Sequence, residues 1–261
     1  MTNQTFKDKT VLITGSGRGI GRGIALHFAR MGADVVVNFF RNRKPAEETA
    51  AEIEKLGRKA LVVKANVGDI EAIQDLFTQT KETFGGLDIF VSNAASGYNR
   101  PVMEQKVKGW DWTMDINARA FLFASQQAVA LMETRGGGHI IAITSPGGER
   151  VMPEYVIVGA SKAALNALTR YMAVELAEKN IRVNAVSPGV VATDVIQYFE
   201  TLSEEGVLEK IAAATPAGRL ITPEDVAGVV AFLCSPEAEM IRGQVITVDG
   251  GLTLPLKTLN L

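Results

Sequence analysis

Short apolar runs alternate with longer segments of helical periodicity along the whole chain. The apolar runs are rich in β-branched residues, and most are apolar at both odd and even positions. Strands that are covered on both faces have this pattern, which is typical of a parallel sheet. The runs predict strands over Thr10–Thr14, Asp34–Phe40, Ala60–Ala65, Asp88–Asn93, His139–Thr144, Ile181–Val186 and Gln244–Val248.

The segments between these runs carry the helical pattern. They predict helices over Ile20–Met31, Pro45–Leu56, Ile70–Phe84, Trp110–Glu133, Lys162–Glu178 and Pro223–Leu233. Alternating strands and helices favour right-handed βαβ units, so the expected fold is α/β, a Rossmann-type doubly wound sheet. No linker or repeat divides residues 1–261, and we expect a single domain.

One long excursion between strand signals covers residues 190–219. Insertions of this kind near the carboxyl ends of strands often cover a substrate. Tyr198, Phe199 and Leu202 within it fit either the lining of an acyl tunnel or an ordinary amphipathic helix.

Composition narrows the class of partner. The chain has 261 residues, 47% of them hydrophobic, and a formal net charge of -2 without a dense basic run. This gives no electrostatic surface for nucleic acid or for a membrane, so a small molecule is the expected partner. Cys234 is the single cysteine and His27 and His139 are the two histidines, so neither a disulfide nor a metal site is expected. No signal peptide or membrane span is evident, and we expect a cytoplasmic protein.

The first predicted strand leads directly into the sequence TGSGRGIG, residues Thr14–Gly21, and a predicted helix follows. Glycines in this context permit a tight turn and bring backbone N–H groups at the start of a helix close to a pyrophosphate. The predicted nucleotide-binding residues of this loop are Gly15, Ser16, Gly17, Arg18, Gly19, Ile20 and Gly21.

The end of the second predicted strand indicates which nucleotide is bound. An acidic residue there would bind the ribose 2′-hydroxyl of NAD. This chain instead has Asn38, Phe39, Phe40 and Arg41, with Arg43 beyond, while Asp34 lies at the opposite end of the strand. Because arginine pairs with phosphate, Arg41 favours NADPH over NADH as the cofactor. The alternative is that these arginines belong to a solvated loop.

The order and spacing of several motifs resemble the short-chain dehydrogenase/reductase family over essentially the whole chain. The motifs are TGSGRGIG, SNAA at Ser92–Ala95, Asn117, Ser145, Ser161 with Lys162, SPG at Ser187–Gly189 and VDGG at Val248–Gly251. The resemblance implies seven parallel strands, transfer of hydride from a nicotinamide cofactor and, commonly, a homotetramer. It also implies further cofactor contacts from Asn66, Val67, Asn93, Ala94, Lys162, Pro188, Gly189, Val191 and Thr193.

The catalytic tyrosine departs from the usual family pattern. Most members place it four residues before the lysine, and here that position is Val158, which cannot donate a proton. Tyr155 is the candidate replacement, with six residues between it and Lys162. This spacing resembles the enoyl-acyl-carrier-protein reductases. The stretches ANVGD, ETFGGLD, NAASG, RPVME, WDWTMDIN and ATPAGR resemble most the type III enzymes of that activity.

The longer spacing has a physical consequence. Residues seven apart point to the same side of a helix, so Tyr155 can still face the cofactor, about 10.5 Å along the axis from Lys162 instead of about 6 Å. Pro153 suits a first helical turn, so Tyr155 is expected at the mouth of the helix. In enoyl thioester reduction the hydride goes to C3 while charge develops on the thioester oxygen at C1, farther from the nicotinamide. A tyrosine displaced outward, with the small Val158 leaving space, suits that reaction.

The remaining roles follow the resemblance. Lys162 is expected to hold the nicotinamide ribose and to lower the pKa of Tyr155. Ser145 either binds the thioester oxygen or only caps its loop, and Asn117 is expected to hold a water chain to Lys162.

The leading hypothesis is therefore an NADPH-dependent reductase of trans-2-enoyl thioesters in fatty acid or related synthesis. The carrier, acyl carrier protein or coenzyme A, is left open. The alternatives are a carbonyl reductase or alcohol dehydrogenase, and a nucleotide-binding protein without catalysis. The retention of Lys162 and Ser145 speaks against the last of these.

Overall fold

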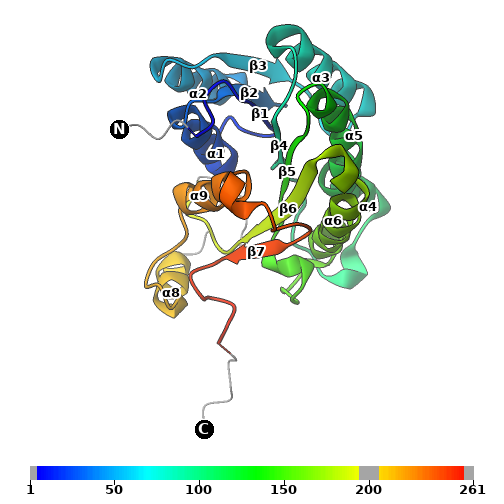
Figure 1. Ribbon diagram of the computed structural model, residues 1–261. Coiled ribbons are helices and arrows are strands. Elements are labelled where there is room, and N and C mark those ends of the chain that lie inside the picture. The colour runs from blue at the N-terminus through cyan, green and yellow to red at the C-terminus, as the bar shows by residue number, and fades with distance from the viewer. Residues whose placement is uncertain (1–4, 194–205, 256–261) are drawn as a thin grey trace.

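The computed structural model describes residues 5–193 and 206–255, and in it seven parallel strands form one sheet with helices on both faces (Figure 1). The strands are β1 (Thr10–Ile13), β2 (Asp34–Phe39), β3 (Ala60–Lys64), β4 (Ile89–Ser92), β5 (Gly138–Ile143), β6 (Ile181–Pro188) and β7 (Val245–Val248). The α-helices are α1 (Gly19–Arg30), α2 (Arg43–Lys55), α3 (Ile70–Phe84), α4 (Val107–Met114), α5 (Ala120–Glu133), α6 (Val156–Glu175), α8 (Val207–Ala214) and α9 (Pro223–Leu233). The predicted doubly wound sheet is confirmed.

Two of the predicted helices have a boundary that is wrong by more than two residues. The predicted helix Trp110–Glu133 begins earlier, at Val107, and a π-helical turn, Asp115–Arg119, separates α4 from α5. The helix predicted over Lys162–Glu178 begins earlier, at Val156, and ends at Glu175. A separate 3₁₀ turn, Ala177–Lys179, follows, and Asn180 ends that turn in a left-handed conformation with φ 55°. A left-handed residue ends a right-handed helix.

The excursion at residues 190–219 is described only in part. Its last portion forms α8, as the short helical signals there predict. Tyr198, Phe199 and Leu202 lie outside the described residues.

The strand pattern divides the core into two layers. Side chains at alternate positions of β1 join different clusters, with Val11 and Ile13 on one face and Leu12 on the other. Helices α1, α2 and α9 cover the first face, and α3, α5 and α6 cover the second. This two-sided burial is the physical reason for the continuous apolar runs in the sequence.

The strand order β3-β2-β1-β4-β5-β6-β7 reverses direction between β1 and β4. Chain segments that leave the carboxyl ends of these two strands go to opposite sides of the sheet, which opens a crevice at that edge. The predicted site residues follow the carboxyl ends of six strands, so the fold brings them to this one edge.

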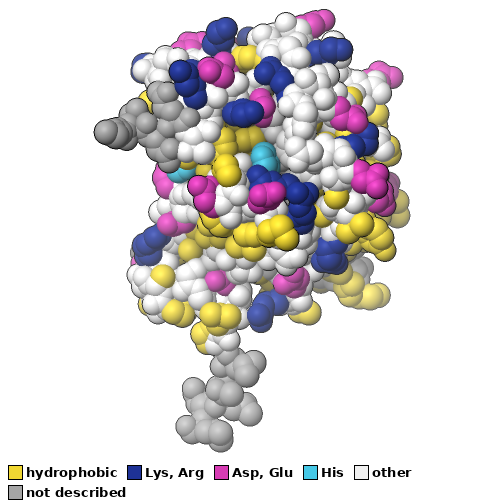
Figure 2. All heavy atoms as spheres, in the orientation of Figure 1, with side chains coloured by type: hydrophobic (Ala, Val, Ile, Leu, Met, Phe, Trp, Pro, Cys, Tyr) yellow, Lys and Arg dark blue, Asp and Glu magenta, His cyan; other side chains and the backbone are white. Residues whose placement is uncertain are grey.

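The face of the molecule in Figure 2 shows no strong bias of charge. Figure 2 shows Lys and Arg side chains interspersed with Asp and Glu over the face in view. Among the helices that the structure describes, none has the length and apolar character that crossing a membrane would require.

His139 lies near the start of β5, at the edge opposite the crevice. Burial, together with Arg182 on β6, lowers the pKa of His139 to about 3. The Arg182 Nε atom lies 3.2 Å from His139 Nδ1, so the imidazole stays neutral beside a cation.

This pKa predicts a loss of stability in acid. Between the folded pKa near 3 and the unfolded value near 6.5, the unfolded chain binds more protons, so stability falls as the pH is lowered through that window. We expect His139 to account for on the order of 4 kcal/mol of lost unfolding free energy between pH 7 and pH 3. Urea denaturation at several pH values should show a shallower acid dependence for His139→Gln. An unchanged slope would contradict the assignment, and His27→Gln, at a less buried imidazole, is the control.

Candidate active site

The glycine-rich loop has the geometry that pyrophosphate binding requires. Gly15 and Gly19 have positive φ angles of 66° and 55°, which favour glycine. A Cβ atom at Gly21 would lie 2.5 Å from Asn93 Nδ2. A side chain at this position would therefore collide with Asn93, in the loop after β4. Arg18 is the N-cap residue of α1, and its side chain does not cap the helix. The first backbone N–H groups of α1 are thus suited to bind a phosphate.

Asn38 supports this loop from β2, a role that sequence reasoning did not assign. Its side chain is buried, and Oδ1 accepts a hydrogen bond from the Gly15 N–H at 3.1 Å. Its Nδ2 atom donates to the Ala65 carbonyl at 3.2 Å, and its backbone pairs with Ser16. Asn38 therefore faces the phosphate loop and not the ribose. The sequence signal for this role was the presence of a polar residue, Asn38, within an otherwise apolar strand.

Asn93 and Thr14 join the loops after β4 and β1 across the crevice. The Asn93 Nδ2 atom donates to the Thr14 carbonyl at 2.8 Å and to the Gly15 carbonyl at 3.3 Å. The Thr14 hydroxyl accepts from the backbone N–H groups of Asn93 and Ala94, each at 3.0 Å. The predicted residues Asn93 and Ala94 thus lie against the phosphate loop, and Asn93 holds it in place.

A hollow of about 590 Å³ opens beside the phosphate loop. Its lining comprises Gly17, Arg18, Gly19, Arg22, Pro45, Glu48 and Thr193. The glycine backbone, the free helix N-terminus and two arginines fit the pyrophosphate and adenosine side of a dinucleotide. Glu48 also faces the hollow, and Lys44 lies 3.8 Å from its carboxylate.

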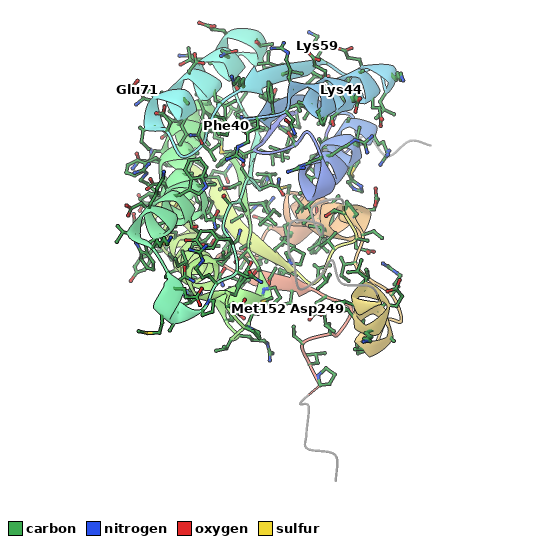
Figure 3. All side chains as sticks on the ribbon, turned by 180° about the vertical axis from the view of Figure 1, so that it is seen from behind. Phe40, Lys44, Lys59, Glu71, Met152 and Asp249 are labelled. Carbon is green, nitrogen blue, oxygen red and sulfur yellow. The ribbon has the colours of Figure 1, made fainter. Side chains whose placement is uncertain are left out.

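The arginines after β2 are exposed. Figure 3 labels Phe40 and Lys44, which flank this segment. Arg41 lies with its guanidinium carbon 6.0 Å from the centre of the Phe40 ring, at the edge of cation–π range. Arg43 begins α2 and pairs with Glu47 at 2.6 Å. Asp34 is bound by Arg58 at the other end of β2, as its position in the sequence indicated.

The other predicted cofactor residues lie at the same edge. Asn66 and Val67 follow β3, and Asn66 Oδ1 accepts from the Gly68 N–H at 3.1 Å. Pro188 ends β6, and the Gly189 N–H bonds to the Val248 carbonyl at 2.9 Å. Val191 and Thr193 follow, and Val191 forms an isolated bridge with Ile221. No ligand tests these contacts, which stay predictions.

Ser145 and Tyr155 form a pair of hydroxyl groups at the carboxyl end of β5. Their oxygen atoms lie 3.4 Å apart, a long hydrogen bond of the kind that tightens when substrate binds. The Ser145 oxygen also accepts from the Gly147 N–H at 3.1 Å, so Ser145 both caps its loop and faces Tyr155. The Tyr155 ring packs on Gly147, where a Cβ atom would lie 2.5 Å from the ring.

Tyr155 is the N-cap residue of α6, at the mouth of the helix as predicted. Pro153 is not in the first helical turn but in a β-turn before it, because α6 begins only at Val156. Burial raises the pKa of the Tyr155 phenol, and the hydrogen bond with Ser145 opposes this. In this structure the pKa of Tyr155 is therefore raised and not lowered, and an effect of Lys162 on it stays a prediction.

Lys162 lies on α6 with its side chain buried. Its Nζ atom donates to the Ile143 carbonyl at 2.8 Å, and within the described ranges it forms no ion pair. Burial lowers the pKa of Lys162 to about 8. A buried ammonium with one partner has donors left for another group, such as a ribose hydroxyl.

Val158 does not leave open space, contrary to expectation. Its side chain is buried, and the backbone at Gly97, with φ 145°, lies directly over it. A Cβ atom at Gly97 would be 2.3 Å from Val158 Cγ2. The loop after β4 thus packs on the side chain at the sequence position where, by the family resemblance, most members carry their tyrosine.

Asn117 lies in the π-helical turn between α4 and α5, and its side chain is buried. The amide bonds to the backbone N–H and carbonyl of Ser96, at 2.8 and 2.9 Å, and to the Ser161 hydroxyl at 2.9 Å. It therefore fixes the loop that carries Gly97 to the helix that carries Lys162. The predicted water chain to Lys162 stays a prediction.

Comparisons with known proteins show which sequences this chain is similar to. Residues 15–253 match the family model described as enoyl-(acyl carrier protein) reductase. The 1-cyclohexenylcarbonyl-CoA reductase of Streptomyces collinus is 40% identical over 247 residues, which cover 93% of this chain and 86% of the relative. A hydroxynaphthalene reductase-like protein of Metarhizium robertsii is 38% identical over 260 residues, which cover 96% of this chain and 97% of the relative.

Solved structures share the fold. A 7α-hydroxysteroid dehydrogenase, described in complex with NADH and 7-oxo glycochenodeoxycholic acid, has a TM-score of 0.90 and 35% identity, with 96% of each chain covered. A short-chain dehydrogenase/reductase variant of Serratia marcescens has a TM-score of 0.88 and 33% identity, with 95% of this chain and 99% of the other covered. The chain belongs to the short-chain dehydrogenase/reductase family of oxidoreductases that use nicotinamide cofactors.

Proposed function

We propose that the protein reduces the carbon–carbon double bond of a trans-2-enoyl thioester with NADPH, in the synthesis of fatty acids or related acyl chains. The position of the acid carries the proposal. Tyr155 reaches the site from the mouth of α6 and faces Ser145 at 3.4 Å, while Val158, at the usual sequence position of the tyrosine, packs against Gly97. The Streptomyces collinus relative supports it, because the name of that protein describes an unsaturated acyl thioester as the group reduced.

Each residue has a defined task in this reaction. A nicotinamide cofactor, when bound, would supply a hydride to C3 of the substrate. The C2–C3 electron pair then shifts so that negative charge develops on the thioester oxygen. The Tyr155 hydroxyl donates a hydrogen bond and then a proton to that oxygen, and Ser145 binds the same oxygen. The resulting enol becomes the saturated thioester when C2 takes up a proton and the oxygen releases its own. Lys162 holds the ribose and so fixes the distance between cofactor and tyrosine.

Ketone reduction is the second candidate. The hydroxynaphthalene reductase-like relatives and the hydroxysteroid dehydrogenase bear names that describe carbonyl or alcohol chemistry. In that reaction hydride goes to the carbon that carries the oxygen, so the acid must lie nearer the nicotinamide. The Ser145–Tyr155 pair alone is compatible with both reactions.

Two thioesters of equal chain length and carrier distinguish these candidates. We expect the NADPH absorbance to fall when the trans-2-enoyl thioester is added and to change little with the 3-ketoacyl thioester. Turnover of the ketone alone would refute the proposal. Tests with acyl carrier protein and coenzyme A thioesters identify the preferred carrier.

Replacement of the acid tests its role. Tyr155→Phe should lower kcat by about 10²–10³-fold, the usual cost of removing an oxyanion donor, while the Kd for NADPH stays unchanged in a fluorescence titration. Tyr171→Phe, at an exposed position on the same helix, is the matched control. If Tyr155→Phe retained most of its activity, another group would be the donor.

NADPH is proposed over NADH because of Arg41. Its guanidinium is exposed just after β2, where the 2′-phosphate of NADPH would lie. A charge-assisted hydrogen bond is worth about 1.5–3 kcal/mol, so Arg41→Ala should lower kcat/KM for NADPH by about tenfold or more, with little effect for NADH. Arg43→Ala is the control, since Arg43 pairs with Glu47. Equal loss with both cofactors would contradict a 2′-phosphate contact.

A homotetramer is proposed as the assembly. Strand β7 is an edge strand of the sheet, and Phe232 on α9 and Met240 before β7 are exposed apolar side chains nearby. Light scattering after size exclusion should give four times the chain mass of 28.0 kDa, and a mass of one chain would refute it.

A further inference from the structure

A strained turn immediately precedes the catalytic tyrosine. Residues Met152–Tyr155 form it, and the Tyr155 N–H donates to the Met152 carbonyl at 3.3 Å. Pro153 is the second residue, and Glu154, the third, has a positive φ of 60°. Proline followed by a residue with positive φ is the pattern of a type II turn, which favours Gly or Asn at the third position. Glutamate there has a conformational cost.

The Glu154 side chain does not explain the conformation. It is exposed, and no hydrogen bond or ion pair of this carboxylate is found in the part of the chain that the structure describes. Asp8 and Asn180 are the other non-glycine residues with positive φ among those described, and both lie away from the site. Contacts outside the turn must therefore hold the positive φ of Glu154, next to Tyr155.

The loop after β4 makes the contacts that hold Glu154 in this conformation. The Arg100 backbone N–H donates to the Glu154 carbonyl at 2.8 Å, which joins the loop after β4 to the turn before α6. The Arg100 guanidinium lies 4.9 Å over the Tyr98 ring. The Tyr98 hydroxyl lies against Gly109 of α4, where a Cβ atom would be 1.7 Å away. The loop is therefore anchored to α4 and α6.

The turn determines where the Tyr155 hydroxyl points. Tyr155 has no preceding helical turn to hold it, because it is the N-cap residue, and its own carbonyl accepts the Gly159 N–H at 2.6 Å. Its ring rests on Gly147 on one side. A change in the backbone at Glu154 would rotate the chain entering Tyr155 and move the hydroxyl from Ser145.

We propose that Glu154 is a positioning residue: its left-handed backbone, held by the Arg100 N–H, aims the Tyr155 hydroxyl at Ser145. The proposal rests on the proposed function only in taking Tyr155 as the acid.

The test compares residues that accept or resist positive φ. Valine resists this conformation, whereas glycine and asparagine accept it. We expect Glu154→Val to lower kcat at least tenfold with little change in the Kd for NADPH, and Glu154→Gly and Glu154→Asn to stay within about twofold of the original protein. Asn180→Val is the matched control, because it places valine at a φ of 55° away from the site and also removes the Asn180 hydrogen bond to Gly136. It should lower the Tm at least as much as Glu154→Val and leave kcat unchanged.

A second readout does not depend on the substrate. The tyrosinate absorbance of Tyr155 is obtained by difference against the same protein carrying Tyr155→Phe. In Glu154→Val the phenol should leave its buried position, so its pKa should move down toward the ordinary value near 10, and Glu154→Gly should leave it unchanged.

These outcomes separate the two proposals. Kinetics are measured with whichever thioester the original protein reduces, so turnover of a ketone alone would refute the proposed function and still test Glu154. If neither thioester is reduced, the titration decides. Equal kcat and equal Tyr155 pKa in Glu154→Val and the original protein would overturn the positioning role, as would equal losses in Glu154→Val and Glu154→Gly.

Discussion

The parallel arrangement of seven strands is the constraint on which the site depends. In a parallel sheet all carboxyl ends lie at one edge, so loops distant in the sequence must meet there. The reversal of strand order between β1 and β4 opens the crevice, and the hydrogen bonds between Asn93 and the Thr14–Gly15 backbone hold its two sides together. The phosphate loop owes its form to these contacts as much as to its own glycines.

The acid end of the site depends on a second set of contacts between loops and helices. Asn117 ties Ser96 to Ser161, and Gly97 then lies on Val158. The same loop continues to Arg100, which holds the turn before Tyr155. One loop thus packs on Val158 and also holds the turn that precedes Tyr155. A displaced donor suits a reaction in which charge develops away from the carbon that accepts hydride.

The pKa shifts of Lys162 and Tyr155 follow mainly from the burial of both groups. Burial lowers the pKa of Lys162 to about 8 and raises the pKa of Tyr155. The desolvation of both groups opposes their charged forms, so the protein alone does not preset an ionised tyrosine. In the proposed reaction, a ribose hydroxyl and a thioester oxygen would give Lys162 and Tyr155 further hydrogen bonds.

The sequence by itself determined the sheet, the phosphate loop and the candidate acid. Apolar periodicity reports burial directly, and glycine spacing and the Tyr155–Lys162 interval are local features that survive without coordinates. Tertiary structure alone decided that Asn38 turns toward Gly15, that Gly97 fills the space over Val158, and that Arg100 holds Glu154. These contacts join residues far apart in the chain. Their partners are chosen by the packing of loops at the sheet edge, which no local pattern of residues encodes.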